Sequence, residues 1–151
     1  MDEQTAAADS DNMQLILQLM QQLQIDGIEP TELLSYLAIE AYEEYTRKGQ
    51  LVSINHAVKM AEYAVQSTPK ESSSLPGLLN NFGVMLGARY ERKGEMADLE
   101  EAIRAAQKAV NSTPEDHPDR AGRLNNLGTK LERRYGRTGE MADLEEAIRA
   151  A

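Results

Sequence analysis

The sequence contains no cysteine, no tryptophan and only one phenylalanine among its 151 residues. The absence of cysteine excludes disulfide bonds, thiolate metal ligands and a cysteine nucleophile, and it favours a cytoplasmic location. Aromatic residues make up only 5% of the chain, so alanine, leucine and methionine must supply most of any core. These residues favour helix over strand. No stretch approaches the roughly 18 consecutive apolar residues that indicate a membrane-spanning helix.

Basic residues are also missing from the first part of the chain. None precedes Arg47, whereas residues 1–30 carry six acidic residues, and the formal net charge of the whole chain is −9. A surface of this kind disfavours binding to nucleic-acid phosphates and to anionic membranes. We therefore expect neither partner, and we predict a disordered acidic tail at residues 1–10.

What the sequence does contain is an internal repeat with a period of 45 residues. The segment GEMADLEEAIRAA occurs at residues 94–106 and again at 139–151. Residues 79–106 and 124–151 are identical at 21 of 28 positions, whereas residues 34–61 and 79–106 share 7 of 28. The pattern predicts a divergent repeat at 31–74, a second repeat at 75–118 and a truncated third at 119–151, preceded by a cap helix and linker at 11–30.

Each repeat has the apolar spacing of two amphipathic helices separated by a glycine turn. We expect helices near 11–24, 31–47, 53–67, 75–92, 98–112, 119–137 and 142–151, and an all-α helix-turn-helix solenoid of about two and a half units. Asp98 with Glu101, and Asp143 with Glu146, have the spacing of a capping box, in which the aspartate begins the second helix of its repeat.

The small residues of the repeat resemble those of the tetratricopeptide family. Leu79-x2-Phe82-Gly83-x2-Leu86 is followed by Ala102-x3-Ala106 in the next helix and then by Pro114, and Leu124-x2-Leu127-Gly128-x2-Leu131 repeats the first part of this pattern. The period departs from the usual 34 residues, and a HEAT or armadillo-like array fits a period of 45 better. The amino-acid sequence of the repeats is also similar to that of repeat arrays in large fungal multidomain proteins. In those proteins the arrays lie beside NACHT-type or CHAT-type domains.

The resemblance implies a scaffold that binds a peptide or partner protein in a concave groove lined by the first helix of each repeat. It assigns hydrogen bonding of the peptide main chain to the residue before Leu-Gly, which here is Asn81 or Asn126, with Asn80 and Asn125 beside them. The alternative interpretation is that these amides contact a neighbouring repeat. The alternative function is a structural or sensor arm of a larger switch protein without a peptide groove.

The equivalent face differs between the ends of the array. In the first repeat, Tyr36 and Ile39 predict an apolar pocket, whereas Lys130 and Arg133 make the third repeat basic. A groove graded in this way would favour a peptide with an acidic tail.

Nothing in the sequence predicts catalysis. The two histidines have no equivalents in other repeats, and no nucleotide-binding or nucleophile motif is present. We therefore expect no enzymatic activity, no metal and no cofactor. Because the third repeat lacks the end of its second helix, we expect its open face to pair with a second copy of the chain in a homodimer.

Overall fold

The computed structural model describes residues 14–15, 18–19, 21–22, 27 and 29–151. Over these residues the chain is helical and contains no strand. Six helices follow one another: α2 (Pro30–Lys48), α3 (Leu51–Gln66), α4 (Leu75–Lys93), α5 (Met96–Asn111), α6 (Arg120–Thr138) and α7 (Met141–Ala150). The all-α prediction is confirmed, and each predicted boundary of these six helices lies within two residues of the observed one.

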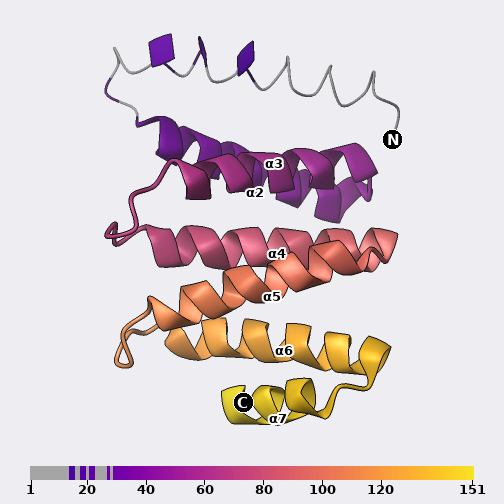
Figure 1. Cartoon of the computed structure of the whole chain (residues 1–151). Coiled ribbons are helices and arrows are strands. Elements are labelled where there is room, and N and C mark those ends of the chain that lie inside the picture. The colour runs from indigo at the N-terminus through magenta and orange to yellow at the C-terminus, as the bar shows by residue number, and fades with distance from the viewer. Residues whose placement is uncertain (1–13, 16–17, 20, 23–26, 28) are drawn as a thin grey trace.

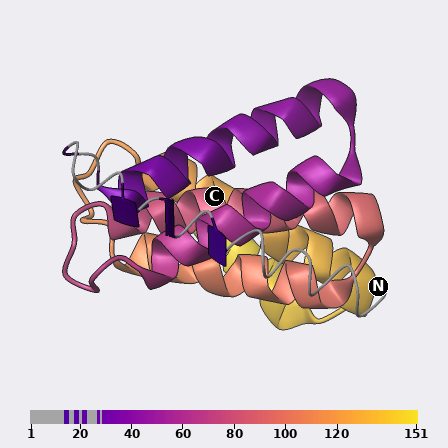
Figure 2. The ribbon, with the colours of Figure 1, turned by 90° about the horizontal axis from the view of Figure 1, so that it is seen from above.

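The helices form three antiparallel pairs that stack in chain order (Figure 1). The most extensive contacts lie within the pairs α2–α3, α4–α5 and α6–α7, and the next most extensive join α3 to α4 and α5 to α6. Seen from above, the start of α2 lies at the same end of the stack as the α3–α4 and α5–α6 connections (Figure 2). The array is therefore an α-helical repeat solenoid.

A glycine closes the first helix of every pair. Gly49, Gly94 and Gly139 have φ values of 67°, 73° and 71°, in the left-handed region that side chains disfavour. Each glycine N–H donates to the carbonyl oxygen of the tyrosine four residues earlier, at 2.7, 2.6 and 2.7 Å respectively. The predicted glycine turns are confirmed, and their strict spacing keeps the helix pairs in the same geometry.

The capping prediction is wrong for the second helix of the second and of the third repeat. α5 begins at Met96 and α7 at Met141, so Asp98 and Asp143 lie inside the first turn, and neither helix has a side-chain cap. Both aspartates are buried and face an arginine of the preceding helix. Asp98 accepts from Arg89 Nε and Nη2 at 2.9 and 2.8 Å, and Asp143 accepts from Arg134 Nε and Nη2 at 2.8 and 2.7 Å.

Each of these bidentate ion pairs joins the two helices of its repeat across the glycine turn and stabilises their packing. The hydrogen bond from Arg134, with the charge of that arginine, holds the pKa of the Asp143 carboxyl below its ordinary value although burial opposes the shift. The same hydrogen bond raises the pKa of Arg134. The aspartates therefore stabilise the packing of two helices rather than the start of one.

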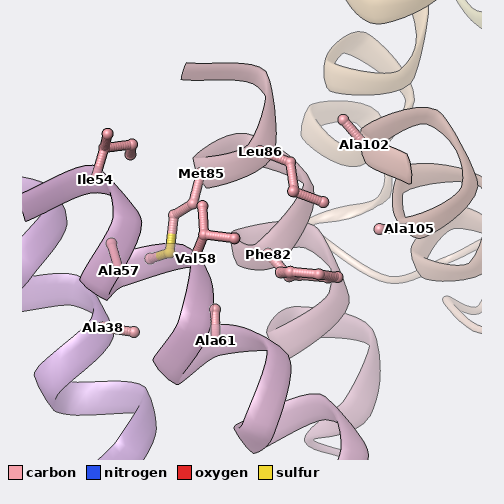
Figure 3. Close-up of a cluster of buried hydrophobic side chains, with 10 residues drawn as sticks. All are labelled: Ala38, Ile54, Ala57, Val58, Ala61, Phe82, Met85, Leu86, Ala102 and Ala105. Atoms are coloured by element: carbon pink, nitrogen blue, oxygen red, sulfur yellow. The ribbon is translucent and has the colours of Figure 1, made fainter. Parts of the chain in front are cut away.

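The core is built from small residues that let the helices approach closely. Figure 3 shows alanines of α2, α3 and α5 around the larger side chains Phe82, Met85 and Leu86 of α4. A Cβ atom at Gly83 would lie 3.3 Å from the carbonyl oxygen of Ala102, which is closer than ordinary contact. At the equivalent Gly128 the nearest atom would be the carbonyl oxygen of Ala147 at 3.6 Å, an ordinary van der Waals distance.

This difference gives opposite expectations for alanine at the two glycines. Gly128→Ala should raise the free energy of unfolding by up to about 1 kcal/mol, because alanine is the better helix former and its methyl group fits. Gly83→Ala should raise the free energy of unfolding by less than Gly128→Ala does, or should lower it, because the Ala102 carbonyl group must move to make room for the methyl group. Leucine at either site should cost roughly 1–3 kcal/mol through overpacking. Urea denaturation of the four variants checks this, and an equal gain for both alanine variants would contradict it.

The N-terminal predictions fall mainly on residues that the structure does not describe. The predicted tail at 1–10 lies wholly outside them. Within the predicted cap helix, the described residues 14, 15, 18, 19, 21 and 22 are helical. Leu15 and Leu19 there are 55% and 50% exposed.

Candidate peptide-binding surface

The paired asparagines of the repeats contact one another between repeats. Asn126 Nδ2 on α6 donates to Asn80 Oδ1 on α4 at 3.1 Å. Both side chains are half-buried, so this bond spans the contact between the first helices of two successive repeats. The arrangement agrees with the alternative interpretation, in which an amide serves a neighbouring repeat. Asn125 is exposed, and Asn81 is half-buried elsewhere on α4.

The two basic residues predicted at the end of the groove, Lys130 and Arg133, both contact other groups of the protein. Lys130 is only 5% exposed, and its Nζ donates to the Asn126 carbonyl oxygen at 3.2 Å. Burial, with a smaller contribution from the charge of Arg133, lowers the pKa of Lys130 to about 8. Arg133 Nε lies 2.6 Å from Glu91 Oε1 on α4. Lys130 is therefore buried rather than on an open face, and Arg133 is paired with an acidic side chain, so both observations disfavour the basic groove end expected at these two residues.

The N-terminal end of the array, in contrast, is open. Tyr36 and Ile39 on α2 are 59% and 38% exposed. They line an open depression of about 540 Å³ between the first half of α2, the α3–α4 connection and the start of α4. Its other lining residues are the apolar Pro69 and Leu78, the acidic Glu29 and Glu32, and the hydroxyl-bearing Thr31, Ser35, Thr68, Ser72 and Ser74.

Asn81 is not among the residues that line this depression, but it lines an adjoining space. This space is narrow, with a volume of about 10 Å³, and it shares Ser35, Ile39 and Leu78 with the depression. Of the eight predicted residues, the structure thus places Tyr36 and Ile39 in the depression and Asn81 in the adjoining space beside Ile39. It places Asn80, Asn126, Lys130 and Arg133 in the contact between α4 and α6 instead.

Sequence reasoning missed the contribution of the α3–α4 connection. This segment reads STPKESSS, and its proline and hydroxyl groups form one wall of the depression. Its serine-rich composition was a signal of an exposed loop, but nothing local indicated that the loop returns beside the start of α2. The acidic rim from Glu29 and Glu32 was missed for the same reason.

Two other kinds of feature were sought among the described residues, a metal-binding cluster and a membrane-spanning helix. Among its residues no group of three or more histidine or acidic side chains is placed to hold a metal ion. None of its helices is both long and apolar enough to cross a membrane.

Comparison with known proteins identifies one repeat. Residues 77–119, which run from α4 to the residue before α6, match the tetratricopeptide repeat family. The comparisons with curated proteins and with solved structures gave no match. The family match bears on the repeat alone and not on the similarity to fungal multidomain arrays. Residues 77–119 are thus a tetratricopeptide-like repeat, set within an all-α solenoid of the kind that serves as a protein-interaction scaffold.

Proposed function

We propose that this chain is a scaffold that binds an extended peptide segment of a partner protein in the depression beside Tyr36 and Ile39. The observation that carries the proposal is the exposure of these two large side chains in an open depression of about 540 Å³. Exposed apolar groups that gather in a concave site favour a ligand with an apolar anchor. The neighbouring hydroxyl groups and the Asn81 amide supply donors and acceptors for a peptide main chain.

The rim charge indicates the kind of peptide. Glu29 and Glu32 line the depression, and no lysine or arginine is among its lining residues. Electrostatic complementarity therefore favours a peptide whose apolar anchor is flanked by basic residues. This proposal replaces the acidic-tailed peptide expected from the sequence, because Lys130 is buried and Arg133 is paired with Glu91 of α4.

Two labelled peptides test the proposal by fluorescence anisotropy. Each carries one central leucine, flanked by lysines in the first peptide and by glutamates in the second. We expect the lysine peptide to bind more tightly, and we expect Ile39→Ser and Glu32→Lys each to weaken it by about tenfold, since each removes a contact worth roughly 1.4 kcal/mol. Equal binding of the two peptides, or unchanged binding by both variants, would contradict the proposal.

Asparagine variants separate a role in binding from a role in packing. Asn81→Ala should weaken the lysine peptide without lowering the melting temperature. Asn126→Ala should leave peptide binding unchanged and cost about 1 kcal/mol of stability, because it removes the hydrogen bond to Asn80. If neither peptide binds, the alternative of a structural or sensor arm without its own peptide site is favoured. The cytoplasmic location expected from the absence of cysteine stays a prediction.

A further inference from the structure

The α3–α4 connection and the α5–α6 connection make the same backbone turns. In both, the threonine N–H donates to the carbonyl oxygen of the valine three residues earlier, at 3.3 Å for Thr68 and 3.1 Å for Thr113. The N–H three residues after the next proline donates to the carbonyl oxygen of that proline at 3.0 Å in both connections. Both threonine hydroxyls also donate to the alanine carbonyl oxygen four residues earlier. Equivalent hydrogen-bond acceptors therefore lie in equivalent places in the two connections.

Arginines of α6 cover these acceptors in the α5–α6 connection. Arg123 Nη1 donates to Thr113 Oγ1 at 2.7 Å. Arg120 Nη1 donates to the carbonyl oxygen of Thr113 and, at 3.1 Å, to that of Val110. Thr113 is only 3% exposed beneath them.

The α3–α4 connection has leucine at both of these arginine positions, namely Leu75 and Leu78. Thr68, whose equivalent Thr113 is buried, is half-buried here and lines the open depression together with Leu78. The depression therefore lies where an arginine side chain covers the connection one repeat later.

A carboxylate accompanies this position in both repeats. In the α5–α6 connection, Asp119 Oδ2 lies 3.4 Å from Arg123 Nη2. A Cβ atom at Gly77 of α4 would lie 3.6 Å from the guanidinium of the same arginine. The residue equivalent to Gly77 one repeat earlier is Glu32, which lines the depression. A guanidinium beside Thr68 would therefore approach a carboxylate where the later repeat has only a glycine.

The neighbouring parts of the chain do not supply such a guanidinium. Residues 1–46 contain no basic residue, so the segment before α2 has none to offer. Lys70, the one basic residue of the α3–α4 connection, is exposed and does not line the depression. An arginine at this position therefore has to come from a bound partner.

We propose that the depression binds an arginine side chain of the partner peptide, an inference that rests on the peptide binding proposed above. The guanidinium takes the place that the Arg123 guanidinium has one repeat later, donates to Thr68 Oγ1 and pairs with Glu32. A guanidinium carries five N–H donors on a planar fork and can serve both acceptors at once, whereas a lysine ammonium is a compact, strongly hydrated charge. The site therefore prefers arginine to lysine.

Peptides that differ only in their flanking side chains test this preference by fluorescence anisotropy. Each carries one central leucine, flanked by arginine, by lysine or by citrulline, which has the shape of arginine without its charge. We expect the arginine peptide to bind about fivefold to tenfold more tightly than the lysine peptide, and the citrulline peptide to bind more weakly than either.

The outcomes separate this inference from the proposed function. Equal binding of the arginine and lysine peptides, both tighter than the glutamate peptide, would overturn the arginine site and leave the basic-peptide site standing. Citrulline binding as tight as arginine binding would overturn the pairing with Glu32. Binding of none of these peptides would overturn both proposals.

Substitutions at Leu78 test where the guanidinium lies. Leu78→Arg introduces the arginine that the next repeat has, so the site should be filled from within and the preference for arginine over lysine should disappear. Leu78→Gln removes the same leucine without adding a guanidinium, so it is the matched control and should keep the preference. Charge repulsion alone would weaken the arginine and lysine peptides equally. A preference that survives in Leu78→Arg, or that is lost in Leu78→Gln as well, would overturn the assigned position.

Thr68→Val tests the hydroxyl acceptor. It should weaken the arginine peptide by about fivefold and the lysine peptide much less, because only the guanidinium reaches the hydroxyl and the carboxylate together. Thr113→Val is the equivalent change in the α5–α6 connection. It removes an acceptor of Arg123, so it should lower the melting temperature and leave the binding of both peptides unchanged. Equal weakening of the two peptides by Thr68→Val, or none, would overturn the role of the hydroxyl.

Discussion

Lys130→Met is expected to stabilise the protein. Lys130 occupies the position of Met85 in the preceding repeat, where methionine is 3% exposed and packs among the alanines of the core. Figure 3 shows the Met85 side chain extending from α4 towards Ala57 and Val58 of α3. Lys130 is buried to a similar degree but carries an ammonium group into this position.

The pKa of Lys130 gives the size of the expected gain. Its pKa falls from the ordinary 10.5 to about 8, mainly because burial disfavours the charged form. Since one pKa unit corresponds to about 1.4 kcal/mol, keeping Lys130 charged in the folded state at neutral pH costs on the order of 3 kcal/mol. We expect Lys130→Met to recover much of this cost and to raise the melting temperature by roughly 4–10 °C.

The stability that Lys130→Met gains should decrease as the pH rises. Below pH 8 the lysine is protonated in both the folded and the unfolded chain, so the full cost is present. Between pH 8 and 10.5 the folded chain loses this proton while the unfolded chain keeps it, so the stability of the native sequence rises. The advantage of Lys130→Met should therefore shrink from pH 7 to pH 10. Lys108→Met, at an exposed lysine of α5, is the control and should change stability little at either pH.

The local elements of this fold could be predicted from the sequence because their signals are local. Apolar spacing located the six helices, and the glycines at 49, 94 and 139 marked the turns that the structure confirms. The capping assignment failed because an aspartate three residues before a glutamate looks the same whether it caps a helix or binds an arginine. The partner Arg89 lies nine residues earlier, across a turn, and only the paired helices bring it to Asp98.

The candidate site could be predicted only in part, because it depends on contacts between repeats. Tyr36 and Ile39 were predicted to form an apolar pocket, and both line the observed depression. The bond between Asn126 and Asn80, however, joins residues 46 positions apart. Whether Lys130 points to an open face or into the contact with α4 likewise depends on how one repeat sits on the next. No periodicity within a single helix encodes that placement.

Asp98→Ala is expected to be strongly destabilising, by about 3–5 kcal/mol, because it leaves the half-buried Arg89 guanidinium without its carboxylate. Asp98 itself is 5% exposed, so water cannot replace it without opening the contact between α4 and α5. Arg89 Nη1 also donates to Asn55 Oδ1 on α3 at 3.4 Å, so loss of the pair should loosen the preceding repeat as well.

Glu101→Ala distinguishes the ion pair from helix capping. A capping box needs both residues, so capping would make Glu101→Ala costly as well. The ion pair needs only Asp98 and predicts that Glu101→Ala costs less than about 0.5 kcal/mol, like an ordinary surface substitution. Urea denaturation of the two single variants decides between them. The double variant Arg89→Met/Asp98→Leu should recover most of the loss, because an apolar pair of similar volume leaves no buried charge unpaired. A double variant as unstable as Asp98→Ala would contradict this explanation. The loss of stability would then come from the shape of the side-chain contact between α4 and α5 and not from the unpaired charge.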